Sequence, residues 1–156
     1  ALIARDGWVE VNGRKIGVPS ICLEEEACQA IKRTKEEDVY NLSRQGIPLI
    51  EIATGAEIKS EEHAKEVASY LGMVLRSVGV KRGLGTIRQD VNVSIKKGAR
   101  TEIKGFQDLR SIVKVIENEV ERQQKLIKHG KKIDPEVRKA ESDFTTSFYN
   151  KFTNGN

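Results

Sequence analysis

The chain has 156 residues, enough for one domain with a hydrophobic core, and 32% of them are charged. Its 27 Lys and Arg against 23 Asp and Glu permit a polyanionic partner without requiring one. The only cysteines, Cys22 and Cys28, form no CxxC pair, and no apolar run approaches the roughly 20 residues of a membrane-spanning helix. The composition therefore points away from zinc, disulfide and membrane frameworks and favours a cytoplasmic protein.

The two ends of the chain predict a piece of a longer protein. The first residues, ALIARDGW, contain no initiator Met, and residues 142–156 are polar and weakly patterned. We expect residues 1–140 to form one partial domain and residues 141–156 to form a tail with little regular structure.

The N-terminal third is predicted to be rich in strands. Residues 8–18 alternate around Asn12-Gly13, the pair typical of a type I′ hairpin turn, and Pro19 is expected to end the second strand. Residues 24–26 are three consecutive Glu that run into one or two predicted helical turns ending near Lys32. A solvated helix start and a ligand role both remain open for these glutamates.

A single carboxylate interrupts the apolar run IPLIEIA at residues 47–53, which is predicted to be a buried strand. That carboxylate belongs to Glu51. Because an ionised carboxylate is costly to bury alone, Glu51 is expected to meet a cation or to face a cleft.

Two amphipathic helices are predicted. Ser60 is expected to cap a helix over residues 61–78, with His63 on its surface. A longer helix is predicted over residues 106–129, ended by Gly130, and residues 134–136 are expected to start one more turn. Together with the strands, these elements predict an α+β fold whose mostly antiparallel sheet is covered by helices.

The most informative stretch is GLGTIRQDVNVSIKKGARTEIK, residues 83–104, which reads as two short strands around a basic turn. If the strands pair with their polar faces matched, two carboxylates lie among cations, an arrangement suited to Mg²⁺ and a nucleotide polyphosphate. The alternative is a solvent-facing hairpin with surface ion pairs. The polar face would carry Arg88, Asp90, Asn92, Arg100, Glu102 and Lys104.

Four segments, in this order, carry a family resemblance: YNLSRQGIPLIEIATGAEIKSEEHA, GLGTIRQDVNVSI, ARTEIKGFQDLRSIVKVIENEVERQ and PEVRKA. They resemble the kinase-type cradle domain of the tRNA-dependent amidotransferases. That family includes the bacterial and organellar B subunits and the archaeal E subunits that act on Glu-tRNA(Gln). TIRQDVNVSI and TEIKG are more similar to the archaeal branch.

The resemblance implies a glutamine-synthetase-like α+β catalytic core. It implies an enzyme that uses ATP and Mg²⁺ to phosphorylate the side-chain carboxylate of Glu esterified to tRNA(Gln). Ammonia from a partner amidase, an asparaginase-like D subunit in archaea, would then displace the phosphate. By the same resemblance, the metal and catalytic carboxylates are Glu51, Asp90 and Glu102, and the residues lining the phosphate and substrate region are Arg88, Asn92 and Lys104.

Two stretches typical of the family, an HxGLExHQ-type strand and an RxYPEPD-type segment, do not occur in this sequence. Since both contribute to the family's metal site, the chain alone is expected to be inactive or weakly active. Two alternatives from other functional classes remain open. One is a basic RNA-binding module that uses the clusters at residues 81–82, 96–97 and 128–132. The other is a subunit-interaction domain that uses the long amphipathic helix.

Overall fold

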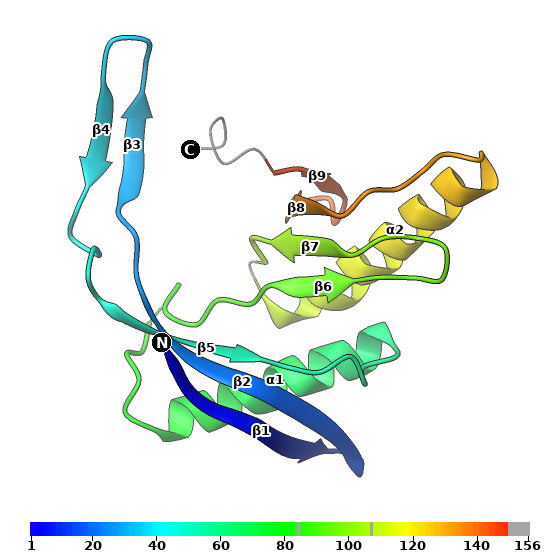
Figure 1. The fold of residues 1–156 in the computed structure, drawn as a ribbon, viewed down its shortest axis with the longest axis horizontal. Coiled ribbons are helices and arrows are strands. Elements are labelled where there is room, and N and C mark those ends of the chain that lie inside the picture. The colour runs from blue at the N-terminus through cyan, green and yellow to red at the C-terminus, as the bar shows by residue number, and fades with distance from the viewer. Residues whose placement is uncertain (84, 107, 150–156) are drawn as a thin grey trace. The chain divides into compact units, whose positions relative to one another are not determined.

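The computed structural model describes residues 1–83, 85–106 and 108–149. These residues form two compact units, residues 1–58 and residues 59–149, which we call the N-terminal unit and the helical unit (Figure 1). The N-terminal unit contains only strands among its helices and strands, in two sheets, and the helical unit contains two helices and a four-stranded sheet. Most strand pairs are antiparallel, so the α+β class is confirmed.

The three-stranded sheet of the N-terminal unit has the order β1-β2-β5, with both pairs antiparallel. The strands are β1 (Leu2–Val11), β2 (Arg14–Glu25) and β5 (Pro48–Ala53). Asn12 and Gly13 both have positive φ, 49° and 72°, as a type I′ turn requires, so the predicted hairpin is confirmed. The prediction that Pro19 ends β2 was wrong. The pairing of β2 with β5 begins only at Ser20, so the missing N–H of Pro19 lies outside that ladder.

The helical turns predicted up to Lys32 are absent, because this stretch forms a narrow hairpin that extends from the sheet of its unit (Figure 1). Its strands are β3 (Gln29–Arg33) and β4 (Asp38–Asn41). The turn between them is stabilised locally. The Thr34 N–H donates to the Glu37 carbonyl at 2.9 Å, and Lys32 Nζ lies 2.6 Å from Glu37 Oε1. These contacts join residues on opposite sides of the turn, and the prediction of helical turns took no account of them.

The helical unit contains a four-stranded sheet of order β6-β7-β8-β9. The strands are β6 (Val91–Val93), β7 (Thr101–Lys104), β8 (Glu136–Ala140) and β9 (Thr146–Phe148). The pairs β6–β7 and β8–β9 are antiparallel, and β7–β8 is parallel. The prediction of a further helical turn starting at residues 134–136 was wrong, because Glu136 is the first residue of β8, which pairs with β7. The stretch 141–156 contains β9, although the sequence showed little pattern there.

Both predicted helices are confirmed, as α1 (Glu61–Ser77) and α2 (Leu109–Lys128). Ser60 caps α1 by accepting a hydrogen bond from the N–H of His63, and the Asp108 carboxylate caps α2. The Asp108 cap explains why α2 begins three residues later than predicted. Gly130, with φ of 66°, follows the last turn of α2 as expected.

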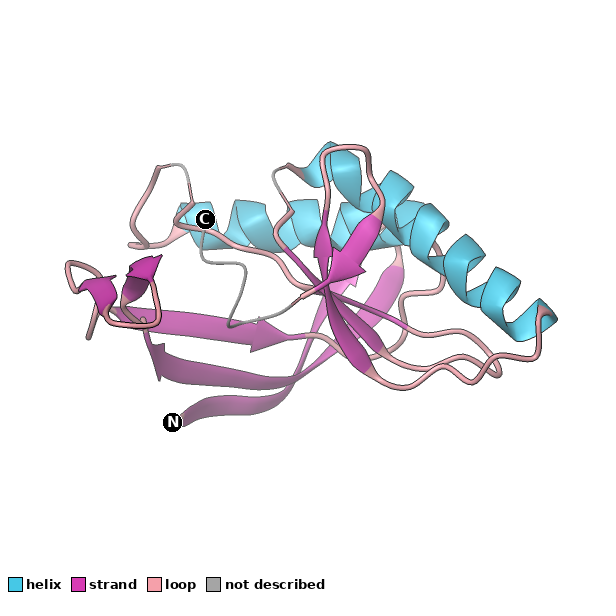
Figure 2. Cartoon of the chain, turned by 90° about the horizontal axis from the view of Figure 1, so that it is seen from above, coloured by secondary structure: helices cyan, strands magenta, loops and turns pink. Residues whose placement is uncertain are grey.

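The core of the helical unit lies between its sheet and α2, with α1 packed beside it. The two helices lie against each other, as the cyan ribbons of Figure 2 show. The buried cluster consists of Val93, Ile103, Ile112, Val115 and Ile116, against which Ala64 and Ala68 of α1 pack.

His63 is buried, with 3% of its surface exposed, so its predicted surface position was wrong. It lies one helical turn before Val67, on the same face of α1, and Val67 is 2% exposed. The apolar stripe of α1 therefore extends into its first turn, where the sequence suggested a solvated start.

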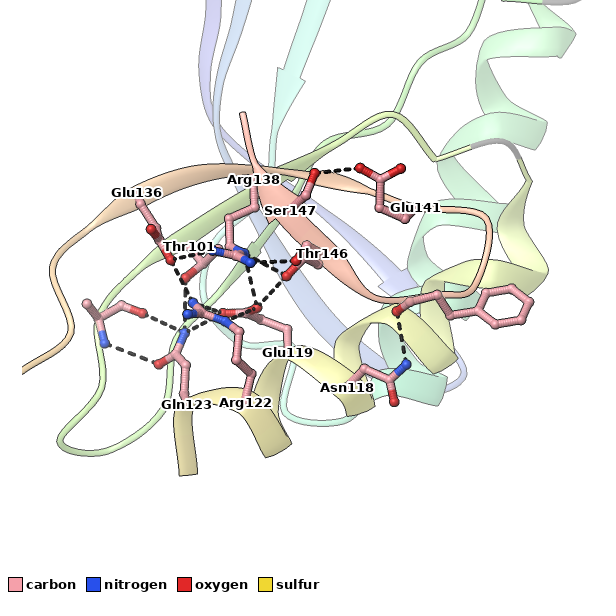
Figure 3. Close-up of polar contacts among 12 residues, drawn as sticks. Thr101, Asn118, Glu119, Arg122, Gln123, Glu136, Arg138, Glu141, Thr146 and Ser147 are labelled. Atoms are coloured by element: carbon pink, nitrogen blue, oxygen red, sulfur yellow. Dashed lines mark hydrogen bonds and ion pairs between the residues drawn. The ribbon is translucent and has the colours of Figure 1, made fainter. Parts of the chain in front are cut away.

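A buried polar network joins α2 to three strands (Figure 3). Glu119 is 1% exposed, and its carboxylate accepts two hydrogen bonds of 2.8 Å from the Arg122 guanidinium and one of 3.0 Å from the Thr146 hydroxyl. The Gln123 amide, fully buried, donates to Glu119 at 3.0 Å and to the Thr101 hydroxyl at 3.1 Å. Arg138 of β8 donates to the Thr146 hydroxyl at 2.7 Å, and its Nε lies 3.9 Å from Glu119.

The charge of Glu119 is stabilised despite its burial. Burial raises the pKa of its carboxyl, but hydrogen bonds from Arg122, Gln123 and Thr146, with the charge of Arg122, outweigh that effect and lower the pKa below its ordinary value. The network was not predicted. Glu119 and Gln123 continue the spacing of Ile112 and Ile116 along α2, and that spacing is the signal that could have found them.

We expect Glu119→Gln to lower the free energy of unfolding by about 3 kcal/mol at neutral pH, because it leaves two arginines without their buried anion. Since the folded pKa lies below the unfolded one, the stabilisation is fully present above the ordinary Glu pKa of about 4.3 and is lost as the pH falls from there through the lower folded pKa. The difference in the free energy of unfolding between parent and variant should therefore become smaller below about pH 4. Urea unfolding at several pH values, followed by the circular dichroism signal of the helices, measures this difference.

The matched control is Glu117→Gln, on the exposed side of the same helix, where Glu117 pairs with Lys114 at 3.0 Å. That change should cost less than about 0.5 kcal/mol. Equal losses in the two variants, or a Glu119→Gln loss that does not depend on pH, would contradict a charged Glu119 as the centre of the network.

Candidate functional site

The paired strands β6 and β7 present one apolar and one polar face, as the sequence predicted. Asn92 stands opposite Glu102 in the antiparallel register. Val93, Thr101 and Ile103 are buried, so the alternating residues of each strand point to the opposite face of the sheet. The matched polar faces that the hairpin interpretation required are therefore confirmed.

Lys104 connects two carboxylates on this polar face. Its Nζ lies 2.6 Å from Asp90 Oδ2 and 2.7 Å from Glu102 Oε1. Asp90 immediately precedes β6, whereas Glu102 and Lys104 lie on β7, so the ion pairs also join the two strands. Side-chain exposures of 44% for Asp90, 32% for Glu102 and 35% for Lys104 leave this triad open to solvent.

The two carboxylates determine the protonation state of Lys104. Partial burial lowers the pKa of its ammonium, but hydrogen bonds and charge interactions with Asp90 and Glu102 together raise it above its ordinary value. Lys104 therefore carries a positive charge at neutral pH. In this structure, the ammonium occupies the point at which the oxygens of Asp90 and Glu102 converge.

The pair Asp90 and Glu102 fits a hard divalent cation. Mg²⁺ in nucleotide sites is commonly held by one or two carboxylates, with waters and phosphate oxygens as its other ligands. Carboxylate oxygens that converge on one ammonium could converge on such an ion instead. Among residues 1–83, 85–106 and 108–149, no group of three or more His, Cys, Asp or Glu side chains is arranged to hold a metal.

A small recess lies beside Glu102. Arg100, Glu102 and Val137, with Pro135 and Glu136, line a pocket of about 120 Å³. The pocket places a guanidinium and a carboxylate, from positions two residues apart in the chain, around the same space.

Glu51 lies in the N-terminal unit, on β5, where it pairs with Cys22 of β2. The prediction of a buried strand was wrong, because β5 is at the edge of its sheet and its side chains are exposed or half-buried. Glu51 is exposed, so the argument that a buried carboxylate needs a ligand no longer applies to it. The role implied by the family resemblance remains a prediction.

The other acidic and basic candidates lie at the surface. Glu24 and Glu25 are exposed at the end of β2, and Glu26 pairs with Arg44 at 3.3 Å. Arg88 is exposed in the segment before β6. The structure thus brings together Asp90, Glu102 and Lys104, with Asn92 on the same face.

The raised pKa of Lys104 gives a testable signature. Titration of the lysine side chains by carbon-13 NMR should show Lys104 losing its proton at a pH above the ordinary lysine range. In Asp90→Asn/Glu102→Gln, burial acts without the two carboxylates, and the pKa of Lys104 should fall below its value in the parent. An unchanged Lys104 titration in the double variant would show that the two carboxylates do not hold the ammonium.

No helix in the described part of the chain is long and apolar enough to cross a membrane. Cys22 and Cys28 are both free thiols.

Comparison with known proteins shows close relatives. The E subunit of the glutamyl-tRNA(Gln) amidotransferase from Archaeoglobus fulgidus is 57% identical over 129 residues, which cover 82% of this chain and 21% of that protein. The protein of the same name from Methanocaldococcus jannaschii is 56% identical over 127 residues, 81% of this chain and 20% of the relative. That from Thermococcus sibiricus is 49% identical over 150 residues, 96% of this chain and 24% of the relative.

The chain thus spans about a fifth to a quarter of the length of the curated relatives it matches. The family of the GatB/GatE catalytic domain matches residues 1–150, nearly the whole sequence. The resemblance inferred from the sequence is confirmed, and the chain belongs to the GatB/GatE catalytic-domain family.

Proposed function

We propose that this chain forms part of the catalytic core of a cytoplasmic glutamyl-tRNA(Gln) amidotransferase. The core would use ATP to phosphorylate the side-chain carboxylate of Glu on tRNA(Gln), which prepares it for amidation to Gln-tRNA(Gln). One observation carries the proposal. The carboxylates of Asp90 and Glu102 converge on a single cation, the Lys104 ammonium, on a solvent-accessible face of the sheet. The names of the relatives, glutamyl-tRNA(Gln) amidotransferase subunits, and their sequence identities of 57% and 56% to this chain support Glu-tRNA(Gln) as the substrate.

Mg²⁺, when bound, would offset the charge of the phosphate oxygens during transfer. Asp90 and Glu102 would hold it, since both present oxygens to the same point. If Mg²⁺ replaced the Lys104 ammonium between the two carboxylates, Lys104 would be able to contact a phosphate oxygen. Asn92, exposed beside Glu102, would offer an amide N–H to the same ligand.

The remaining parts of the proposal come from the family resemblance. Glu51 would be a third metal ligand, Arg88 would contact the phosphates, and the complete core would have a glutamine-synthetase-like fold. Ammonia would come from a partner amidase, the asparaginase-like D subunit, within a hetero-oligomer. The relatives are named as subunits, which agrees with such an assembly.

Isothermal titration calorimetry with ATP, with and without Mg²⁺, tests the proposal on this chain. We expect Mg²⁺-dependent binding by the parent and a loss of about tenfold or more in Asp90→Asn and in Glu102→Gln, because each change removes a charged metal ligand. The matched control is Asp134→Asn, an exposed carboxylate paired with Lys132 at 2.8 Å, which should bind ATP as the parent does.

Circular dichroism should first show that every variant is folded. Equal affinities in the parent and both variants would contradict the assignment of the metal nucleotide to this face. So would the absence of Mg²⁺-dependent binding by a folded parent.

A further inference from the structure

A second lysine lies beside Lys104 on the polar face of the sheet. In the parallel register of β7 and β8, Lys139 is the direct partner of Lys104. The preceding residue, Arg138, points to the α2 side, where its Nε lies 3.9 Å from Glu119. Because side chains alternate along a strand, Lys139 points to the opposite face, the one that carries the triad of Asp90, Glu102 and Lys104.

The path of the Lys139 side chain supports this position. A Cβ built on Gly105 would lie 3.5 Å from Lys139 Cγ, so the lysine stem passes next to the residue that follows Lys104. Lys139 is half-buried. Neighbouring strands are only about 4.8 Å apart, so the two lysine stems start close together.

The charges of the two lysines are balanced differently. Lys104 is paired with two carboxylates, whereas the Lys139 ammonium has no ion pair or hydrogen bond with any of the residues that the structure describes. Glu141 follows two residues along the same face, and its carboxylate accepts the hydroxyl hydrogen of Ser147. Asp90 and Glu102 thus already offset the charge of Lys104, and Lys139 is the cation beside the triad whose charge has no such partner among the described residues.

We infer that Lys139 binds a phosphate oxygen of the ligand that occupies this face, next to Lys104 and the carboxylate pair. This inference rests on the proposed function and adds to it a phosphate-binding residue that the sequence did not indicate. The shared chemistry is a phosphate group, which a nucleotide triphosphate or an RNA backbone can supply. An ammonium is a suitable partner, since charge-assisted hydrogen bonds to phosphate are among the stronger polar contacts.

The experiment uses two metal-free probes and the whole chain. Tripolyphosphate represents the nucleotide, and a short single-stranded oligoribonucleotide without a terminal triphosphate represents RNA. We expect Lys139→Gln to weaken tripolyphosphate binding about tenfold, the effect of losing one hydrogen bond between charged groups. Lys139→Arg should retain most of the affinity. The control Lys125→Gln, which removes an exposed α2 lysine paired with Glu121, should leave it unchanged.

The outcomes separate the ligand sources and the two proposals. A tenfold loss for tripolyphosphate supports a nucleotide on Lys139, and a loss for the oligoribonucleotide alone supports an RNA phosphate on the same residue. If Lys139→Gln binds both probes as the parent does, or if the parent binds neither, the inference is overturned. Lys139-dependent tripolyphosphate binding without Mg²⁺-dependent ATP binding would contradict the proposed function and leave this inference standing.

Discussion

The arrangement of the helical unit depends on the buried carboxylate of Glu119. The hydrogen bond that it accepts from Thr146 joins α2 to β9, and Arg138 extends the network to β8. A buried charge of this kind is costly unless it is fully paired, so the partners cannot move apart without a large loss of stability. Because α2 is also the connection between the parallel strands β7 and β8, the network restrains β7, which carries Glu102 and Lys104, and β8, which carries Lys139.

The sheet thus has two polar systems of different character. On the α2 side, Glu119 and Gln123 are fully buried and their hydrogen bonds are satisfied. On the other side, the triad of Asp90, Glu102 and Lys104 is partly exposed, and its ion pairs contribute little to folding. A rigid buried side and an exchangeable exposed side suit a site at which a metal replaces an ammonium, since only the exposed contacts need to change.

The candidate site was predictable because it is made of local alternation. The period-two pattern of residues 83–104 set the faces of β6 and β7, and the family resemblance assigned chemistry to them. The cap at Ser60 and the turn at Asn12-Gly13 were also local signals, and both predictions were confirmed.

Several of the wrong predictions concern features that depend on distant partners. The sequence up to Lys32 is by itself compatible with a helix, and its strand conformation follows from pairing with β4. The exposure of Glu51 follows from the edge position of β5. The position of Lys139, about which the sequence made no prediction, follows from the parallel register of β7 and β8. Single-sequence patterns do not specify which strands become neighbours, and these residues acquire their surroundings only from that choice.

Paramagnetic NMR with Mn²⁺ and ATP tests most directly whether the polar face of β6 and β7 holds a metal nucleotide. Addition of the complex to the nitrogen-15-labelled chain should broaden the amide signals of Asn92, Glu102 and Lys104 first, and Asp90→Asn/Glu102→Gln should abolish that selectivity. Broadening centred on other residues, or an unchanged pattern in the double variant, would show that the metal nucleotide does not bind at the triad.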